Sequence, residues 1–464
     1  MIRLFSHYVP TKLLILFGLE AVIFIASVYV GAALRFYDPL QGSPFPTDIA
    51  GQALSFAAAM LVIMVTVGLY SAESPEGVKG MVIRLAIAFV VGLGTMSLVF
   101  YLLPDLYLGR GAFGFGWLIA FFAVFFLRLA FFHWTRLGVF NRRILVLGTG
   151  TRAVNVDLLA SRTHSNTNLR IVGFLPLLAT QHHVQPSRIL PGEQSILSAV
   201  RKYAINEVII AVRDRRGGGL PMEDLLECKL LGVKVTELSS FYERERGQLR
   251  IDSMNASWLV FGDGFRQNIL REIVKRAFDV TASVVVLLSA LPVMAFGALL
   301  ILMEDGRPIF YRQQRVGQGG KAFDILKFRS MRKDAEKDGK PRWATARDDR
   351  TTQVGRIIRK LRIDELPQVV NVLRGEMSFV GPRPERPFFV EELAKEIPYY
   401  NARHSIKPGI TGWAQVRYPY GASLEDAIEK LQYDLYYVKN HTLFLDIMIL
   451  MQTVQVVLLG KGAR

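Results

Sequence analysis

The heptapeptide Arg362-Ile363-Asp364-Glu365-Leu366-Pro367-Gln368 places two carboxylates side by side, at the centre of a cation-rich stretch that runs from Lys327 to Gln415. Neighbouring side chains point to opposite faces of a strand and diverge by about 100° on a helix. One carboxylate can therefore act on a reacting atom while the other binds a second group. We take Asp364 and Glu365 as the candidate catalytic pair.

Positively charged side chains flank this pair on both sides. They form three groups, which are Lys327, Arg329 and Arg332, then Arg359, Lys360 and Arg362, then Arg383 between two prolines. Arginine binds phosphate through two parallel hydrogen bonds, which lysine cannot reproduce. Carboxylates among such cations predict phosphoryl transfer with a divalent metal. A solvated surface held together by salt bridges explains the charges equally well, so charge alone does not decide.

Four motifs occur in a fixed order through this stretch. They are Lys327-Phe328-Arg329-Ser330-Met331, Asp364-Glu365-Leu366-Pro367-Gln368, Ser378-Phe379-Val380-Gly381-Pro382-Arg383-Pro384 and Pro408-Gly409-Ile410-Thr411-Gly412-Trp413-Ala414-Gln415-Val416. With them, the chain from Arg271 to the C-terminus resembles the bacterial sugar transferase family, the monotopic phosphoglycosyl transferases. The resemblance implies an enzyme that moves a hexose 1-phosphate from a UDP-sugar onto undecaprenyl phosphate and releases UMP, with UDP-glucose or UDP-galactose as the expected donor.

The resemblance also implies roles for individual residues. Asp364 matches the nucleophile that forms a phosphosugar-aspartyl intermediate, and Glu365 matches its metal-binding neighbour, with Mg²⁺ as the cofactor. Three further residues match positions that bind phosphates or brace the site: Lys327, Arg359 and Arg383. Arg329 is added as a phosphate-binding residue from its charge and its nearness in sequence.

Other residues of the stretch have a structural interpretation beside the functional one. Arg362 either joins the site or pairs with an acid on the surface, and the sequence leaves both open. Trp413 is expected in the core or at an interface rather than against a uridine ring. His404 has no metal-ligand companion at a suitable spacing and is expected to be a packing or surface residue. A helix at 353–361 is expected to bring Arg359 towards the carboxylates.

The composition indicates a membrane protein of two or three domains. Of the 464 residues, 51% are hydrophobic, and the mean hydropathy of +0.27 exceeds what a soluble protein needs. A net charge of +16 can attract nucleic acid, but beside apolar spans it places cations along the anionic cytoplasmic leaflet, so no nucleic-acid partner is expected. The single Cys228 excludes an intramolecular disulfide framework and is expected to be an ordinary apolar residue.

Residues 1–140 contain four apolar runs, which predict a four-helix transmembrane domain. The runs cover about 13–33, 50–69, 81–103 and 113–132, each near the roughly 20 residues that cross the hydrocarbon as a helix. Cations gather before the first run, between the second and third, and after the fourth, which predicts that both ends of the block are cytoplasmic. Glu20 lies inside the first run, where it either joins helices or is protonated or close to the interface.

Residues 141–245 change to short β-rich segments between helices, which predicts a Rossmann-like α/β domain. Strands are expected near 143–147, 169–174, 207–211 and 234–237. Gly148 and Gly150 lie in a G-x-G-x-x-A version of the dinucleotide fingerprint. No acidic residue follows the second strand to bind ribose, so both glycines are expected to serve the tight turn rather than a nucleotide.

The apolar segment at about 280–303 is long enough to span a membrane, yet Pro292 near its middle removes a helical hydrogen bond. A crossing would put Asp364 and Glu365 outside, away from cytosolic nucleotide sugars. We therefore predict a re-entrant helix that breaks at Pro292 and returns to the cytoplasmic face, as the resemblance also implies. The family usually has Ser before this proline, whereas this chain has Leu291. A full crossing is the alternative.

The predicted protein is a multi-domain membrane protein with a helical transmembrane bundle, the α/β domain, a linker at 246–270 and an α+β monotopic catalytic domain at 271–464. It is expected in the bacterial inner membrane, with a cytoplasmic catalytic domain that starts exopolysaccharide or O-antigen type glycan synthesis, and the α/β domain could form a homodimer contact. One alternative is a membrane-tethered sugar nucleotide-modifying enzyme, which needs a Tyr-x-x-x-Lys pair in the α/β domain; Tyr8 and Lys12 have that spacing but precede the first span. The other is a non-catalytic membrane scaffold.

Overall fold

The computed structural model divides the chain into two compact units. Unit 1 comprises Met1–Ile2 and Val9–Phe241, and unit 2 comprises Arg3–Tyr8 and Tyr242–Arg464. The structure describes residues 1–36, 49–70, 77–136, 141–162, 169–177, 183–191, 195–212, 220–253, 264–265, 268–333, 335, 350–419, 421 and 423–458. Much of the predicted linker at 246–270 lies outside the described residues.

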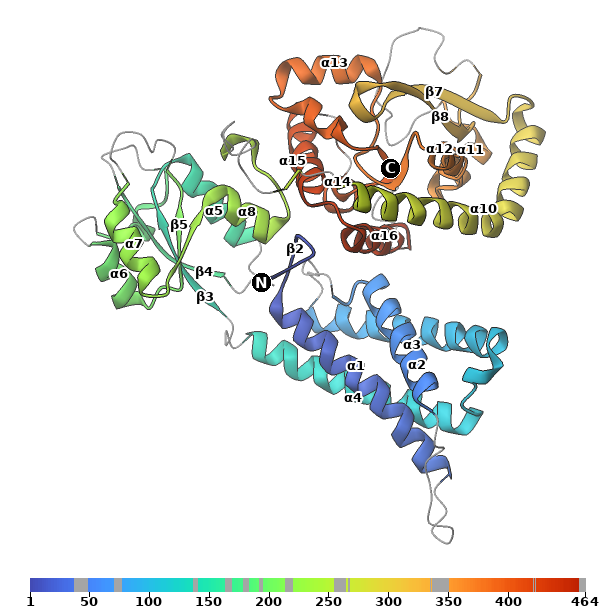
Figure 1. The fold of residues 1–464 in the computed structure, drawn as a ribbon, viewed down its shortest axis with the longest axis horizontal. Coiled ribbons are helices and arrows are strands. Elements are labelled where there is room, and N and C mark those ends of the chain that lie inside the picture. The colour runs from blue at the N-terminus through green and yellow to red at the C-terminus, as the bar shows by residue number, and fades with distance from the viewer. Residues whose placement is uncertain are drawn as a thin grey trace. The chain divides into compact units, whose positions relative to one another are not determined.

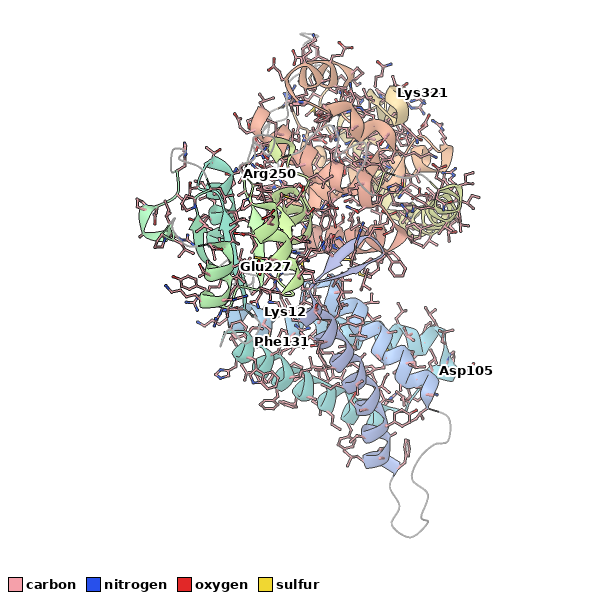
Figure 2. All side chains as sticks on the ribbon, turned by 60° about the vertical axis from the view of Figure 1, so that its left-hand side comes forward. Lys12, Asp105, Phe131, Glu227, Arg250 and Lys321 are labelled. Atoms are coloured by element: carbon pink, nitrogen blue, oxygen red, sulfur yellow. The ribbon has the colours of Figure 1, made fainter. Side chains whose placement is uncertain are left out.

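Four apolar helices occupy the N-terminal part of unit 1. They are α1 (Thr11–Phe36), α2 (Ala50–Thr66), α3 (Gly77–Leu102) and α4 (Arg110–Arg136). Three of them are long and apolar enough to cross a membrane, whereas α2 has 17 residues and measures about 26 Å. In Figure 2 the labelled Lys12 and Phe131 lie at one end of this bundle and Asp105 lies away from them. The chain therefore enters and leaves the bundle at the same end.

Glu20 forms an ion pair inside the bundle. It is fully buried, and Arg128 of α4 contacts it from Nε to Oε1 at 2.6 Å and from Nη2 to Oε2 at 2.9 Å. Arg128 also donates to the Leu69 carbonyl at 3.0 Å, and the Tyr70 hydroxyl donates to Glu20. Of the interpretations that the sequence leaves open, the structure supports a contact that joins α1, α4 and the turn after α2.

The second part of unit 1 is a parallel sheet covered by helices on both faces. Its strands are β3 (Arg142–Leu147), β4 (Leu169–Leu175), β5 (Glu207–Ile210) and β6 (Lys234–Glu237), in the order β4-β3-β5-β6. These agree with the four predicted strands. Figure 1 shows α5 (Thr151–Arg162) on one face, with α6 (Ile196–Tyr203) and α7 (Met222–Leu230) on the other. Cys228 of α7 is buried in the core that α6 and α7 form with the sheet, as an ordinary apolar residue.

The turn after β3 contains both glycines of the predicted fingerprint. Gly148 has a φ of +107°, which L side chains rarely adopt, and its N–H donates to the Leu175 carbonyl at 2.8 Å. In the same turn, the carbonyl of Thr149 accepts a hydrogen bond from the His183 N–H at 2.9 Å. A Cβ on Gly150 would meet nothing within 4 Å. The conformational role predicted for Gly148 fits these contacts, whereas Gly150 has room for a side chain.

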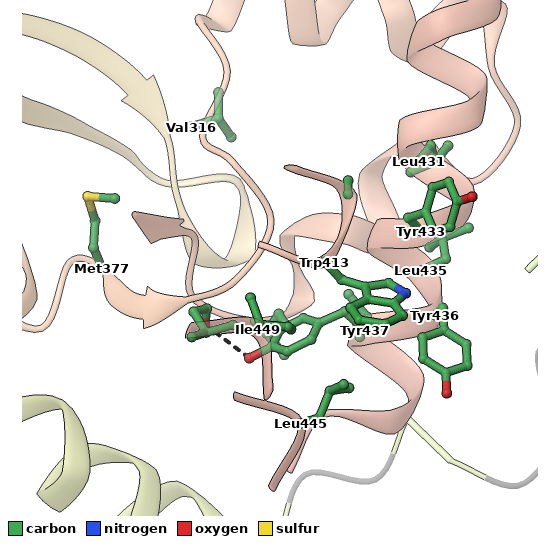
Figure 3. Packing of buried hydrophobic residues seen from close by; sticks show 14 of the residues in the cluster. Val316, Met377, Trp413, Leu431, Tyr433, Leu435, Tyr436, Tyr437, Leu445 and Ile449 are labelled. Atoms are coloured by element: carbon green, nitrogen blue, oxygen red, sulfur yellow. Dashed lines mark hydrogen bonds between the residues drawn. The ribbon is translucent and has the colours of Figure 1, made fainter. Parts of the chain in front are cut away.

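Unit 2 is built around a core that is rich in aromatic side chains. Several of them come from α14 (Trp413–Arg417) and α15 (Leu424–Asn440), whereas α16 (Leu443–Leu458) adds the aliphatic Leu445 and Ile449. Figure 3 shows Trp413 beside Tyr436, and the two rings stack with centroids 5.9 Å apart. Trp413 is 1% exposed and its indole N–H donates to the Gly247 carbonyl at 2.7 Å, which confirms it as a core residue. His404 is also buried, which supports packing over the surface position that the sequence also allows.

Short strands and helices surround this core and carry the sequence motifs. The strands are antiparallel β7 (Phe310–Val316) and β8 (Ala322–Phe328), and parallel β9 (Ser378–Val380) and β10 (Gly409–Thr411). The helices are α8 (Leu238–Arg246), which begins in unit 1, then α11 (Gln353–Lys360), α12 (Gln368–Arg374) and α13 (Pro387–Glu396). The predicted helix at 353–361 is thus confirmed as α11.

The long apolar helix of unit 2, α10 (Ile269–Asp305), has 37 residues and continues through Pro292. If straight, it would measure about 55 Å. Figure 1 shows that its ribbon turns instead, so that the yellow end points in a different direction from the first part. The structure thus has a bent helix where the sequence predicts a broken one. Both ends contact the same unit: Arg276 donates to the Val372 carbonyl at 2.6 Å, and Glu304 accepts the Gln353 N–H at 2.7 Å.

Segments before and after α10 pack into one core. Leu249, which precedes α10, donates its N–H to the Gln432 carbonyl at 3.0 Å. The N-terminal hairpin of β1 (Ile2–Leu4) and β2 (His7–Val9) joins them, because His7 Nδ1 lies 2.7 Å from the Tyr436 hydroxyl. The start of the chain and the segments on both sides of α10 therefore share the interior of unit 2.

Candidate active site

Asp364 and Glu365 lie on η5 (Ile363–Glu365), a single turn of 3-10 helix between α11 and α12. After α11, Arg362 adopts a left-handed φ of +57°, which redirects the chain. Pro367 then caps the start of α12, where the N–H that proline lacks is not needed. Asp364 and Glu365 are each 9% exposed, so the pair is buried between two helix ends.

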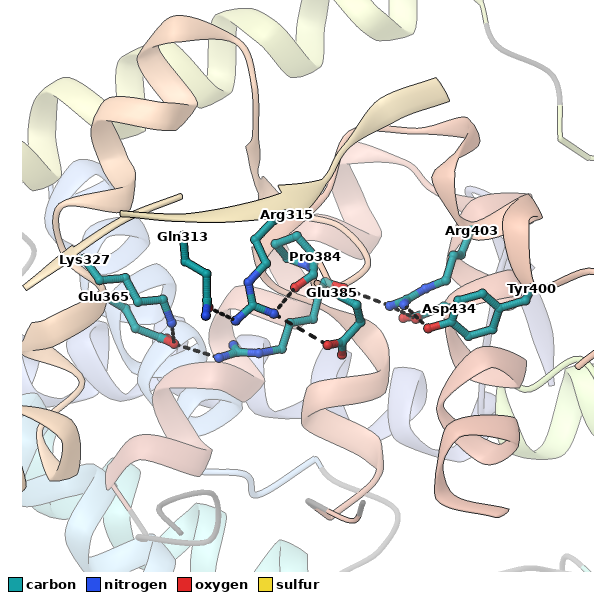
Figure 4. A network of polar contacts seen from close by, with 10 residues as sticks. Gln313, Arg315, Lys327, Glu365, Pro384, Glu385, Tyr400, Arg403 and Asp434 are labelled. Atoms are coloured by element: carbon teal, nitrogen blue, oxygen red, sulfur yellow. Dashed lines mark hydrogen bonds and ion pairs between the residues drawn. The ribbon is translucent and has the colours of Figure 1, made fainter. Parts of the chain in front are cut away.

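Three cations surround the carboxylate of Glu365. Lys327 Nζ lies 3.0 Å and Arg383 Nη2 lies 2.8 Å from Oε1, while Arg362 Nη1 lies 3.4 Å from Oε2. Figure 4 shows Lys327 pointing at Glu365. Burial alone would raise the pKa of Glu365, but the cations outweigh it and hold the pKa well below its ordinary value. Glu365 is therefore ionised at neutral pH and already paired.

Asp364 has a different environment from its neighbour. Its Oδ1 atom is buried and accepts no hydrogen bond from the residues that the structure describes. Burial, and then the negative charge of Glu365, raise the pKa of Asp364 to about 6, although Lys327, Arg359 and Arg362 act in the opposite direction. At neutral pH the carboxylate is ionised, and its unpaired oxygen can attack an electrophile without first losing a hydrogen bond.

Lys327 reaches the site from β8, where it pairs with Tyr311 of β7. The buried Asn371 of α12 fastens β8 to the helix that follows the carboxylates. Its Oδ1 accepts the Leu326 N–H at 3.0 Å, and its Nδ2 donates to the Asp324 carbonyl at 2.8 Å. Lys327 is thus held opposite η5 by its sequence neighbours.

Arg383 lies on a loop whose carbonyl groups are held by two other arginines. Arg403 Nη2 donates to the Arg383 carbonyl at 2.9 Å and contacts Asp434 Oδ2 at 2.7 Å. Arg315 Nη1 donates to the Pro384 carbonyl at 3.2 Å. Figure 4 shows Arg403 facing Asp434 and Arg315 beside Pro384. Because Arg403 and Asp434 are both buried, a desolvated ion pair fixes the backbone that presents Arg383.

Three glycines allow this loop to approach β10 closely. A Cβ on Gly381 would collide with the Lys407 carbonyl oxygen, one on Gly409 with the Gly381 nitrogen, and one on Gly412 with the Gly381 carbonyl oxygen. The backbones pair directly here, since the Gly381 N–H donates to the Thr411 carbonyl at 2.9 Å. The glycines of two motifs are therefore needed for packing of backbone against backbone.

Arg329, which the sequence suggests as a phosphate-binding residue, contacts the end of α10. Its Nη2 donates to the carbonyls of Asp305 at 3.0 Å and Gly306 at 2.8 Å, and lies 3.1 Å from the Asp305 carboxylate. Arg329 is buried. These contacts brace α10 against the segment that follows β8, and phosphate binding by Arg329 stays a prediction.

Glu365 is the residue that the resemblance predicts as a Mg²⁺ ligand. Among the described parts of the chain, no group of three or more His, Cys, Asp and Glu side chains could hold a metal ion. Mg²⁺ usually binds one or two carboxylates and completes its shell with substrate phosphates and water. The acids present here therefore fit an ion that arrives with a phosphate-bearing substrate, and they do not fit an ion held by the protein alone.

Two of the residues that shape the site are not singled out by the sequence. Arg403 lies 20 residues from Arg383, and no spacing rule links a side chain to a carbonyl at that distance. Asn371 lies on α12 as one polar residue among apolar ones, and its two bonds to β8 depend on tertiary packing. The sequence does point to Arg362 as unusual. It directly follows the predicted helix at 353–361, at a position where helices usually have glycine.

The C-terminal part of the chain matches known proteins. Residues 270–460 match the family model for bacterial sugar transferase, and this region contains all four motifs. Over 268 residues the chain is 40% identical to a protein of Aeromonas hydrophila named UDP-N-acetylgalactosamine-undecaprenyl-phosphate N-acetylgalactosaminephosphotransferase, with 58% of this chain and 62% of that protein covered.

Two further relatives match over shorter lengths. The chain is 41% identical over 194 residues to the undecaprenyl-phosphate glucose phosphotransferase of Komagataeibacter xylinus, with 41% of this chain and 36% of that protein covered. It is 40% identical over 196 residues to the uncharacterized sugar transferase EpsL of Bacillus subtilis (strain 168), with 41% of this chain and 91% of that protein covered. The chain thus spans less than two thirds of the first two relatives and nearly all of the third.

Replacing Gly409 by alanine should destabilise unit 2 by about 2 kcal/mol or more, because the new Cβ collides with the Gly381 nitrogen and the backbone must shift. Thermal unfolding of the full chain measures this effect. Gly150→Ala is the matched control and should leave the midpoint nearly unchanged, since its Cβ meets nothing within 4 Å. Equal effects of the two substitutions would contradict the close-approach argument.

Proposed function

Because this chain belongs to the bacterial sugar transferase family, we propose that it transfers a hexose 1-phosphate from a UDP-sugar to undecaprenyl phosphate and releases UMP. The observation that carries the proposal is the unequal pair on η5, in which Glu365 is neutralised by cations while a buried oxygen of Asp364 accepts no hydrogen bond from the described residues. The names of two relatives, which contain undecaprenyl-phosphate with N-acetylgalactosamine or glucose, support this class of donor and acceptor.

Asp364 is the nucleophile in this proposal. Its carboxylate oxygen forms a bond to the sugar-bearing phosphorus of the donor, and the bond from that phosphorus to the bridging oxygen breaks, so that UMP leaves with that oxygen. An ionised carboxylate needs no base for this step. A phosphate oxygen of undecaprenyl phosphate then attacks the same phosphorus, and the bond to Asp364 breaks. The step returns the carboxylate and yields the sugar linked through a diphosphate to the lipid.

The cations around Glu365 stabilise the phosphates in this scheme. Lys327 and Arg383 pair with Glu365 in the structure, and the same donors can turn to phosphate oxygens when the donor binds. Arginine suits this exchange because its planar group can form two hydrogen bonds to one phosphate. Arg359 lies close enough to lower the pKa of Asp364, and its charge favours the ionised nucleophile. Arg403 contributes indirectly by holding the Arg383 backbone.

Glu365 would hold Mg²⁺ together with phosphate oxygens of the donor. When bound, the ion supplies positive charge that polarises phosphorus–oxygen bonds and stabilises the departing UMP. Because its pKa lies well below the ordinary value, Glu365 does not have to lose a proton to bind a cation.

We also propose that α10 is re-entrant and that the catalytic domain is monotopic, on the cytoplasmic face of the bacterial inner membrane. If α10 crossed the bilayer, Leu249 before it and Val316 after it would lie on opposite sides, yet both belong to one core. Glu243 and Lys439 form a buried ion pair across the same interval, at 2.8 Å. The middle of α10 exposes apolar side chains that suit lipid, among them Leu288. UDP-sugars are cytosolic, so the site faces its donor.

In a cell this reaction would place the first sugar of an exopolysaccharide or O-antigen type glycan on its lipid carrier. Its product is the substrate class that a glycosyltransferase acting on lipid-linked sugars would extend. A homodimer through the α/β domain stays a prediction, which the mass of the nanodisc-embedded protein would decide.

Purified full-length protein in nanodiscs, with undecaprenyl phosphate and Mg²⁺, should release UMP from one member of a panel of UDP-glucose, UDP-galactose and UDP-N-acetylgalactosamine. Asp364→Asn should lower this rate by at least about 10⁴-fold, because the amide cannot form the phosphorus–oxygen bond. Its unfolding midpoint should not fall, since Oδ1 accepts no hydrogen bond from the described residues. Asp324→Asn removes an exposed carboxylate of the same domain and serves as the control. Substantial turnover by Asp364→Asn would exclude Asp364 as the nucleophile.

The value of kcat/KM for UMP release should fall as the pH drops through about 6, because Asp364 must be ionised to attack and its pKa is about 6. Arg359→Gln should move this acidic limb to higher pH, since Arg359 lowers the pKa of Asp364. Arg356→Gln removes an exposed arginine one turn earlier on α11 and should leave the limb in place. A limb that does not move in Arg359→Gln would contradict this electrostatic coupling.

The re-entrant topology can be tested with single cysteines in a Cys228→Ala background. Asp252→Cys precedes α10 and Lys321→Cys follows it, and both positions are exposed. A membrane-impermeant maleimide should label both only after the cytoplasmic face is opened. Asp105→Cys, in the connection between α3 and α4, should be labelled in intact cells and is the control. Labelling of residues 252 and 321 from opposite faces would show that α10 crosses.

A further inference from the structure

Arg362 combines an unfavourable backbone with a position beside both carboxylates. Its φ of +57° and ψ of 18° lie in the left-handed region. Non-glycine residues rarely adopt this conformation, and glycine is the usual residue just after a helix C-terminus. The fold therefore holds an arginine where glycine would be relaxed. A structural turn does not require a side chain at this position, so the side chain needs its own explanation.

The side chain of Arg362 points back to the carboxylates. Its Nη1 lies 3.4 Å from Glu365 Oε2, and 37% of the side chain is exposed. Its charge also lowers the pKa of both Asp364 and Glu365, although for each of them burial is the largest influence on the pKa and acts in the opposite direction. Arg362 therefore lies within electrostatic reach of both acids while it remains accessible to a molecule that approaches from solvent.

Arg362 is the cation that Glu365 can release most easily. The contacts of Lys327 and Arg383 with Oε1, at 3.0 Å and 2.8 Å, have the length of strong charge-assisted hydrogen bonds. The contact of Arg362 with Oε2, at 3.4 Å, is longer than the usual N–H···O range. A second anion at the site would compete with Glu365 for Arg362 before it competed for the other two cations.

The site carries an excess of positive charge that such an anion can neutralise. Four cations, Lys327, Arg359, Arg362 and Arg383, act on the two carboxylates, which leaves an excess of two positive charges at neutral pH. The diphosphate of a nucleotide sugar carries two negative charges. We propose that Arg362 binds the donor diphosphate, an inference that rests on the proposed function. Arg362 is then a substrate-binding residue. Its charge binds the substrate, although the backbone conformation at this position favours glycine.

The test uses the full chain in nanodiscs with Arg362→Gly, Arg362→Lys and Ala204→Gly. UDP affinity is measured by titration calorimetry, and inorganic pyrophosphate serves as a competitor that carries the phosphates without the nucleoside. Arg362→Gly should weaken UDP and pyrophosphate by a similar factor of roughly tenfold or more, because each loses a charge-assisted hydrogen bond. Its unfolding midpoint reflects two opposing effects, since glycine relaxes the turn while Glu365 loses one of its three cations. Arg362→Lys should retain part of the affinity, because the positive charge remains.

Ala204→Gly is the matched backbone control, since Ala204 has a left-handed φ of +48° outside unit 2. It should raise the unfolding midpoint and leave UDP affinity unchanged. Unchanged UDP affinity in Arg362→Gly would overturn the inference, and so would a loss for UDP that pyrophosphate does not share. A raised KM for undecaprenyl phosphate alone would assign Arg362 to the acceptor and would also overturn it. If the wild type binds UDP but releases no UMP from any donor, the proposed function is wrong. The UDP and pyrophosphate affinities of the variants still test whether Arg362 binds a diphosphate.

Discussion

The ion pairs of Glu365 are the interaction on which the rest of the catalytic unit depends. An ionised carboxylate with so little exposure costs several kcal/mol unless it is paired. Its partners come from three separate places: Lys327 from β8, Arg383 from the loop after β9, and Arg362 from the turn after α11. The three cations pair with Glu365 only when these three parts of the chain meet around it. The fold and the charge of the site are therefore set together.

The sequence predicted the members of the site better than their contacts. Motif order brought Asp364, Glu365 and Arg383 into one hypothesis, and apolar runs predicted the membrane helices, because both signals lie in local composition. Lys327 pairs with Glu365, and Arg329 contacts the end of α10. Both outcomes depend on which face of a short turn meets which strand, and residue spacing does not record that.

Helix α10 is hydrogen-bonded to β9, the strand that leads into the loop of Arg383. Asp279 of α10 accepts hydrogen bonds from the Ser378 hydroxyl at 3.0 Å and from the Phe379 N–H at 3.1 Å, both on β9. Lys275 of α10 contacts Asp446 of α16 at 2.6 Å and donates to the Val380 carbonyl at 3.1 Å. Since β9 leads directly into the loop of Arg383, a displacement of α10 would be transmitted to the cation that pairs with Glu365. The long apolar helix thus helps to hold the polar site.

The contact between His7 and Tyr436 joins residues that are 429 positions apart. At about 5–20 residues per second, a ribosome needs roughly 20–90 s to make the intervening chain. The N-terminal hairpin is thus synthesised well before the part of α15 that it contacts. Throughout that interval the helices of unit 1 can enter the bilayer, whereas the hairpin has to stay unpaired. The hairpin can therefore join the interior of unit 2 only after α15 has been made.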